Sequence, residues 1–214
     1  MPAIKKRSLV DQVYDRLRAD IVSLHIPLGS RVNVNELQET LGVSCTPIRE
    51  AVNRLQQEGL IEYENNIGAR VISLTPKDVE DIQQLAVTLH CAAVELAMAR
   101  GDRAEMAAQI DRRIAEFETA STPQGQVTAV HQLVGVFYAH CGNTRLDRSM
   151  LAIQGQQLLL RSLYAAGGAD APRDLADFRR VLAGVEAGDA AAVCAALREN
   201  AERMERAIQA GLRQ

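Results

Sequence analysis

Helix breakers recur at five points in the second part of this chain, and their spacing limits its fold more than any other feature. The breakers are Gly101-Asp102, Ser121-Thr122-Pro123, Gly142-Asn143, Gly167-Gly168 and Gly188-Asp189. Glycine and proline end helices, and each stretch between two breakers is long enough to form one. The chain beyond Thr75 is therefore expected to form six helices. An interrupted apolar stripe without sustained heptads argues against a coiled coil.

The start of this helical part has the residues that favour a helix N-terminus. Thr75 suits the N-cap, Pro76 suits the first helical position, and Asp78 lies in the first turn, where it meets the positive end of the helix dipole. At 214 residues and 47% hydrophobic content, the chain is long enough for two small domains. We predict a mainly α protein with domains at residues 1–74 and 75–214.

The first domain is predicted to contain three helices and a two-stranded wing. The helices are expected at about residues 9–24, 34–41 and 45–58, and the strands at 61–64 and 69–73. The apolar face expected for the first helix consists of Leu9, Val13, Leu17, Ile21 and Leu24. Gly42 can adopt the positive φ that a sharp turn between the second and third helices requires. This pattern is typical of a helix-turn-helix.

The start of the third helix carries the residues that indicate DNA binding. Ser44 is a suitable N-cap and leaves Thr46 and Arg49 near the exposed beginning of the helix. A helix-turn-helix places that end in the major groove, so double-stranded operator DNA is the predicted partner. Residues 1–75 hold nine basic and nine acidic side chains. Because this charge is balanced, we expect moderate affinity that depends on a homodimer, with help from Lys5–Arg7 on phosphate.

Several classes of protein are disfavoured. The sequence has no run of eighteen apolar residues, so no membrane span is predicted. Its basic start is not followed by the apolar stretch of a signal peptide, so no signal peptide is predicted. Four scattered cysteines form no CxxC pair, which fits reduced thiols in the cytoplasm. We find no nucleotide-binding loop and no motif of hydrolytic catalysis, so an enzyme is not expected. A helical scaffold whose winged module binds protein instead of DNA stays open as the alternative.

The first domain resembles the winged helix-turn-helix of GntR-type regulators. The similarity is carried by Leu28–Asn33, Glu36-Leu37, Leu41–Ser44, Thr46–Ala51 and Gly59–Ile61. The helical part, with Gly142-Asn143 and Ala187-Gly188-Asp189, resembles the FCD ligand-sensing domain of the FadR branch, and its six helices resemble the VanR-like subgroup. The resemblance implies a homodimeric regulator, in the first instance a repressor, controlled by a small metabolite.

The resemblance also implies which residues contact DNA, and this chain departs from the family pattern at two of those positions. Family members usually carry Arg where this chain has Asn35 and Cys45, whereas the recognition-helix Arg49 is retained. Asn prefers adenine and Cys recognises no base well, so the operator is expected to differ from the family's usual half-site. The residues predicted to contact DNA are Asn35, Ser44, Cys45, Thr46, Arg49, Gly68 at the wing and Arg31.

Many FCD domains bind a divalent metal through one Asp and three His. Those positions fall here on Val130, Val134, Phe178 and Asn200, which cannot form that site, so no metal and no other cofactor is expected. The Arg that often meets the effector's carboxylate falls on Ala86. We therefore predict an effector that is apolar or weakly polar. The predicted effector-binding residues are Ala86, His90, Val130, Val134, Gln157, Arg161, Phe178 and Asn200.

Other residues allow a second interpretation. Cys45 at a helix N-terminus could act as a redox switch, although a plain substitution is favoured. His90 could ligate haem, but a lone His in an apolar setting is more often structural. His131, His140 and Cys141 are interpreted as surface residues. Arg198, Arg203 and Arg206, with the glutamates between them, are interpreted as a solvated, ion-paired face.

Overall fold

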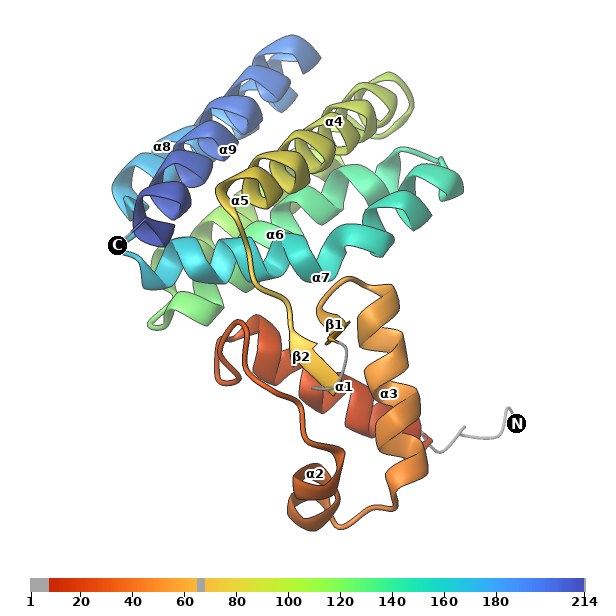
Figure 1. The fold of residues 1–214 in the computed structure, drawn as a ribbon. Helices are drawn as coiled ribbons and strands as arrows, with labels where there is room; N and C mark the ends of the chain where they lie inside the picture. The colour runs from red at the N-terminus through yellow and green to blue at the C-terminus, as the bar shows by residue number, and fades with distance from the viewer. Residues whose placement is uncertain (1–7, 65–67, 214) are drawn as a thin grey trace, which may run out of the picture. The chain divides into compact units, whose positions relative to one another are not determined.

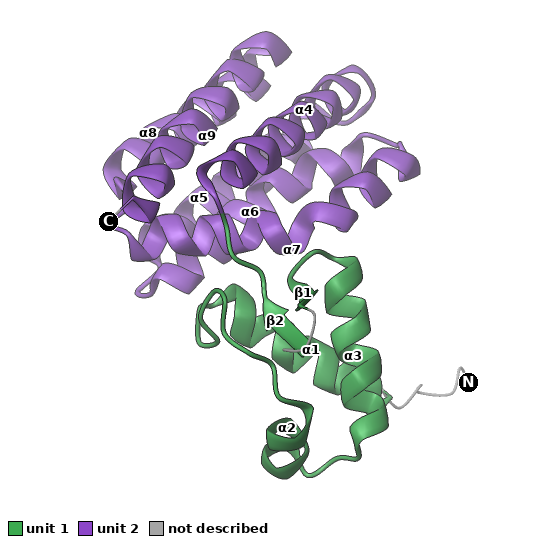
Figure 2. Ribbon diagram, in the orientation of Figure 1, with its two compact units in different colours: residues 1–74 green, residues 75–214 purple. Residues whose placement is uncertain are grey.

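The structure is a computed structural model that describes residues 8–64 and 68–213. It forms two compact units, and the boundary lies between Leu74 and Thr75 (Figure 2). Each unit is described by itself. The predicted DNA-contacting arm Lys5–Arg7 lies outside the described residues.

The first unit packs three helices against a small antiparallel sheet (Figure 1). Its elements are α1 (Leu9–Val22), α2 (Val34–Leu41), α3 (Cys45–Gln57), β1 (Ile61–Glu64) and β2 (Gly68–Val71). Ile61 pairs with Val71 in the sheet. Helix α3 packs against both α1 and α2. Ile48 and Leu55 of α3 lie in the centre of the core. The other fully buried core residues include Leu17 and Ile21 of α1 and Leu60 after α3.

Two expectations for α1 are wrong. The helix ends at Val22 instead of Leu24, because Leu24 adopts a left-handed conformation with φ 63° that turns the chain away. Leu9 was expected in the core, but 56% of its surface is exposed. The middle of the predicted apolar face, Val13 to Ile21, is buried as expected.

The turn between α2 and α3 is confirmed. Gly42 has φ 65° and its amide donates to the carbonyl oxygen of Gln38, which ends α2. Ser44 occupies the N-cap of α3, but its hydroxyl makes no capping hydrogen bond to the described part of the chain. The Ser44 side chain is exposed and remains available to an external group.

The second unit consists of the six predicted helices. They are α4 (Pro76–Arg100), α5 (Arg103–Thr119), α6 (Pro123–His140), α7 (Thr144–Ala166), α8 (Ala171–Ala187) and α9 (Ala190–Leu212). Every predicted breaker separates two of them. The capping box at the start of α4 is formed as expected. The Thr75 and Asp78 side chains each accept a hydrogen bond from the backbone amide of the other residue. The mainly helical fold class is confirmed.

Helix α4 packs against α6, α7 and α9, and α8 packs against α5 and α9. Gly184 allows close approach of α8 and α9, because a Cβ atom there would lie 2.7 Å from Val193 Cγ2. Phe117 and Phe178 meet edge to face at 5.2 Å between ring centroids. By length and composition α4 could cross a membrane. Helix α4 contacts three other helices, as a core helix of a bundle does, and such core helices can have the same length and apolar composition as a membrane span.

Candidate functional site

A groove of about 420 Å³ lies on the first unit, between the start of α2, one face of α3 and the wing. It brings together four of the predicted DNA-binding residues: Arg31, Asn35, Arg49 and Gly68. The other three, Ser44, Cys45 and Thr46, lie at the beginning of α3 and do not line the groove. The full lining consists of Arg31–Asn35, Arg49, Asn53, Tyr63, Gly68 and Ala69.

The arginines of this unit fall into two groups. Four of the six between residues 8 and 74 form ion pairs with carboxylates of the same unit, and their partners are Asp20 for Arg16, Glu58 for Arg18, Asp11 for Arg54 and Glu64 for Arg70. Arg31 and Arg49 form no ion pair with any described residue, and both are exposed. The two arginines with uncompensated charge are thus the two in the groove.

The beginning of α3 is fixed to α2 by one side-chain contact. The Cys45 thiol donates to Gln38 Oε1 at 2.7 Å, and this bond joins the two helices of the helix-turn-helix. Ser44 and Thr46 on either side of Cys45 are exposed. Cys45 therefore has a structural contact that the sequence did not predict.

Six of the ten groove residues were missed by sequence reasoning, and two of them, Asn53 and Tyr63, present polar groups that can contact DNA. Asn53 lies four residues after Arg49 and thus on the same face of α3, so helical spacing alone could have indicated it. Tyr63 projects from β1 with 51% of its surface exposed, and its hydroxyl lies 3.4 Å from Asn53 Oδ1. An exposed tyrosine on a strand gives no comparable signal in sequence.

The second unit contains a cavity formed by α5 to α9. It encloses about 30 Å³, and the whole hollow including its open mouth measures about 350 Å³. Its lining consists of Phe117, Gln126, Val127, Val130, Arg161, Tyr164, Ala165, Ala169, Asp174, Phe178 and Asn200. Four of the eight predicted effector-binding residues are among them: Val130, Arg161, Phe178 and Asn200.

The other four predicted effector residues do not line this cavity. Ala86 and Val134 are buried in the helical core. Gln157 is buried, and its Oε1 atom accepts a hydrogen bond of 3.1 Å from Arg161 Nε. The Nδ1 atom of buried His90 lies 3.0 Å from the Tyr138 hydroxyl, and burial lowers the His90 pKa to about 3. Two of the lining residues that were not predicted could have been found from helical spacing. Val127 lies three residues before the predicted Val130, and Tyr164 lies three residues after the predicted Arg161.

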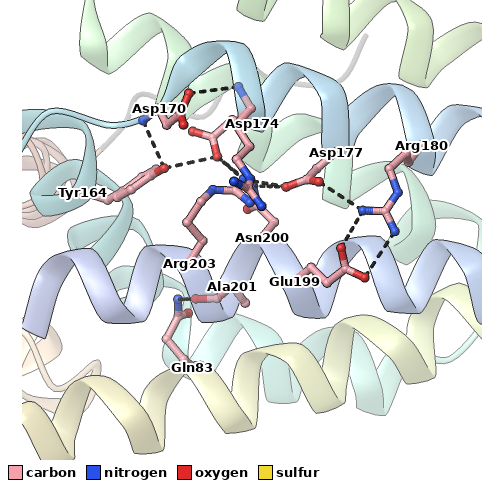
Figure 3. A network of polar contacts seen from close by, with 11 residues as sticks. Gln83, Tyr164, Asp170, Asp174, Asp177, Arg180, Glu199, Asn200, Ala201 and Arg203 are labelled. Carbon is pink, nitrogen blue, oxygen red and sulfur yellow. Dashed lines mark hydrogen bonds and ion pairs between the residues drawn. The ribbon is translucent and has the colours of Figure 1, made fainter.

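A buried ion network joins α8 to α9 (Figure 3), and two of its members, Asp174 and Asn200, line the cavity. Arg203 Nη2 lies 2.6 Å from Asp174 Oδ1 and close to Asp177 Oδ2, and Asn200 Nδ2 donates to Asp174 Oδ1 at 2.9 Å. Burial opposes the charge on Arg203, but the hydrogen bonds to the two carboxylates raise its pKa above the ordinary value. The expectation that Arg203 belongs to a solvated face is wrong. Cys141, expected at the surface, is also buried.

The residues at the family's metal positions do not fit a metal. Val130, Val134 and Phe178 have no donor atom, and the Asn200 amide nitrogen donates to Asp174. Across the described ranges, no three His, Cys, Asp or Glu side chains are grouped as metal ligands would be.

A winged helix-turn-helix followed by a six-helix unit with an internal cavity defines a class of two-part bacterial regulators. The comparisons agree: residues 9–71 match the model for bacterial regulatory proteins of the gntR family, and residues 81–211 match the FCD domain. This chain belongs to the FCD-containing GntR family.

Individual relatives are more distant. The chain is 34% identical over 109 residues to the uncharacterized HTH-type transcriptional regulator YdhC of Bacillus subtilis. This match covers 51% of the present chain and 48% of YdhC. It is 35% identical over 106 residues to the Nta operon transcriptional regulator of Aminobacter aminovorans, covering 50% of each. The matches thus span about half the length of these relatives. Escherichia coli McbR/YncC shares the fold, with a TM-score of 0.77 at 21% identity over 98% of this chain and all of the other.

Proposed function

We propose that this chain is a DNA-binding transcriptional regulator of the cytoplasm. The observation that carries the proposal is the groove in which Arg31 and Arg49 carry charge that no described carboxylate neutralises. Such cations attract phosphate, and an Arg on the recognition helix can bind guanine O6 and N7 through two hydrogen bonds. Asn35 suits adenine, and Ser44 and Thr46 carry exposed hydroxyls at the same helix end.

The proposed functional form is a homodimer on a two-fold symmetric operator. One recognition helix would then enter each half-site, with the half-sites roughly 34 Å apart. Repression is the simplest outcome, because a dimer that covers an operator excludes polymerase without further components. Neither role requires catalysis, and we propose none.

The cavity between α5 and α9 is the proposed effector site. Phe117, Val127, Val130 and Phe178 give it an apolar wall that suits the apolar part of a small metabolite. Effector binding would favour one arrangement of the dimer over another and so change operator affinity, which is a population shift instead of a reaction.

The test is selection of double-stranded fragments of about 30 base pairs from a random library, followed by binding titrations with Arg49→Ala. We expect the wild-type protein to enrich a palindrome, and Arg49→Ala to weaken binding by roughly tenfold or more, because one bidentate base contact per half-site is removed. Arg54→Ala is the matched control, because it lies on the same helix but is paired with Asp11.

Failure to enrich any sequence, or equal affinity of the Arg49→Ala variant, would contradict the proposal. The latter result would revive the alternative of a scaffold that binds protein, for which the comparisons give no support. A loss of affinity for the control variant as large as that for Arg49→Ala would mean that the effect comes from α3 stability and not from a base contact.

A further inference from the structure

Two of the four cysteines lie against each other inside the helical unit. Cys91 on α4 and Cys194 on α9 are 103 positions apart in the sequence, but α4 packs against α9 (Figure 1). The Cys194 thiol donates to the Cys91 carbonyl oxygen at 3.9 Å, and the two side chains hydrogen-bond to each other. Both thiols are free, and the two residues are 5% and 3% exposed. Two thiols in contact across a pair of helices can form a disulfide with little movement of the backbone.

The other two cysteines contact oxygen atoms instead of sulfur. The Cys45 thiol donates to Gln38 Oε1 at 2.7 Å, and the Cys141 thiol donates to the Tyr138 carbonyl oxygen at 3.3 Å. All four cysteines belong to the part of the chain that the structure describes. Cys91 and Cys194 are thus the pair in which two sulfur atoms meet.

The surroundings of the pair make one thiol a nucleophile and the other a proton donor. The hydrogen bond from Cys194 lowers the Cys91 pKa to about 7 although burial opposes this, whereas the same hydrogen bond and burial raise the pKa of Cys194. Exposed Arg198 also lowers the Cys91 pKa, and exposed Glu95 has a smaller effect in the opposite direction. Cys91 is therefore a thiolate in a large part of the molecules at neutral pH, and the thiolate is the form that reacts with oxidants.

A groove between α4 and α9 brings solvent close to the pair. It measures about 360 Å³, and its lining includes Val87 and Arg198. Val87 lies four residues before Cys91, and Arg198 lies four residues after Cys194, so both thiols lie about one helical turn beyond these lining residues. Because the two thiols are nearly covered, this approach suits an oxidant not much larger than water.

We propose that Cys91 and Cys194 form a reversible disulfide between α4 and α9 when the protein meets hydrogen peroxide. The Cys91 thiolate attacks one peroxide oxygen: an S–O bond forms, the O–O bond breaks, and hydroxide leaves and takes a proton from solvent. The Cys194 sulfur then attacks the resulting sulfenic acid at Cys91. The S–S bond forms, the S–O bond breaks, and the hydroxyl group leaves as water with the Cys194 proton. The two cysteines lose two electrons in total, and the peroxide gains them.

The disulfide ties the first helix of the second unit to the last. A covalent S–S bond is shorter than a hydrogen bond between two thiols, so the two side chains must approach each other when it forms. Helix α4 is the first element after the boundary between Leu74 and Thr75. We expect the change in α4 to alter operator affinity, and this step alone rests on the proposed function.

The experiment counts and maps the thiols of the reduced full-length protein after oxidation. The protein is treated with a small molar excess of hydrogen peroxide, quenched with catalase, alkylated in urea and digested with trypsin. We expect two of the four thiols to be lost. The digest should contain the Cys91 peptide linked to the Cys194 peptide, and dithiothreitol should restore both thiols.

Variants assign a role to each thiol. Cys194→Ser should stop the reaction at the sulfenic acid of Cys91, which dimedone traps, whereas Cys91→Ser should give no dimedone adduct at Cys194. The double variant Cys45→Ser, Cys141→Ser is the matched control and should still form the linked peptide. If a variant at Cys91 or Cys194 fails to fold, as its melting temperature shows, the peptide maps of the wild type and of the control still decide.

Two results would overturn the proposal. One is a native protein that keeps all four thiols under conditions that oxidise the urea-unfolded chain, and the other is a linked peptide that joins different cysteines, such as Cys91 with Cys141. Operator titrations of the reduced and oxidised protein should differ by roughly fivefold or more. Equal affinities would contradict the regulatory step and leave the disulfide site supported. If the reduced protein selects no operator, the proposed function fails, while the peptide map still decides whether the disulfide forms.

Discussion

Arg203 on α9 and Asp174 on α8 form an ion pair of 2.6 Å in the interior of the helical unit, where their side chains are 16% and 6% exposed. Asp177, one turn further along α8, shares the same guanidinium. The three groups join the last two helices beside the cavity. Arg180 also pairs with Asp177, at 3.3 Å, but the shortest contacts of both carboxylates are with Arg203, so this cluster is sensitive to replacement of Arg203.

Replacement of Arg203 by Met should destabilise the protein by about 3–5 kcal/mol, because buried Asp174 would lose its cation and buried Asp177 would keep only its longer contact of 3.3 Å with Arg180. Urea unfolding of the purified variant measures the change. Arg206→Met, three residues further along α9, removes only an exposed pair with Glu202 and should change the free energy of unfolding by less than about 0.5 kcal/mol. Addition of Asp174→Asn and Asp177→Asn to Arg203→Met should recover part of the stability. Equal destabilisation by both single variants would contradict this account.

Buried His90 should make stability depend on pH. Its folded pKa is about 3, mainly because burial disfavours the charged ring, with smaller effects of Arg161 and His131. The unfolded chain binds a proton near its ordinary pKa of about 6.5, and the folded chain does not. Stability should therefore fall as pH drops below about 6.5, by up to about 1.4 kcal/mol per pH unit, until the folded pKa is reached.

The measurement is urea unfolding of wild type and His90→Gln at several pH values between about 7 and 5. The variant has no titrating ring and should lose less stability than the wild type on acidification. Exposed His25→Gln serves as the control and should follow the wild type. Parallel pH curves for wild type and His90→Gln would show that His90 is protonated in the folded protein.

Arg31 should contribute to DNA affinity through phosphate instead of base recognition, since it lines the groove but precedes α2 and is not part of the recognition helix α3. Arg31→Ala should weaken binding to all sequences alike and reduce the slope of log K against log salt by about 0.9 for each phosphate that the variant no longer neutralises. Titrations at several salt concentrations measure that slope. Arg16→Ala, whose cation is paired with Asp20 on α1, should leave it unchanged. A change in sequence preference with Arg31→Ala would assign Arg31 to a base.

The sequence predicts what local physics decides and misses what tertiary contacts decide. Gly42, the Thr75–Asp78 capping box and the breakers between α4 and α9 act within a few residues, and all were predictable. Arg203 was not, because helical spacing places it among charged residues while its partners lie about 30 positions away on α8. The effector prediction shows the same division: Val130 and Phe178 both line the cavity, whereas Ala86 is buried in the helical core and His90 on α4 contacts Tyr138 on α6, which the pattern of a single helix does not reveal.

Gly42 and Gly135 provide a matched test of the turn that forms the helix-turn-helix. A Cβ added at either position would meet no atom within 4 Å, so steric contacts do not distinguish them. Gly42, however, has φ 65°, whereas Gly135 lies inside α6 without a positive φ. Gly42→Ala should therefore destabilise by about 1–2 kcal/mol through left-handed strain, and Gly135→Ala should stabilise by about 0.5–1 kcal/mol through helix propensity. Thermal unfolding measures both, and opposite signs are required. The same sign for both substitutions would mean that the turn at Gly42 relaxes to another conformation, and DNA binding by Gly42→Ala would then report whether α3 keeps its place.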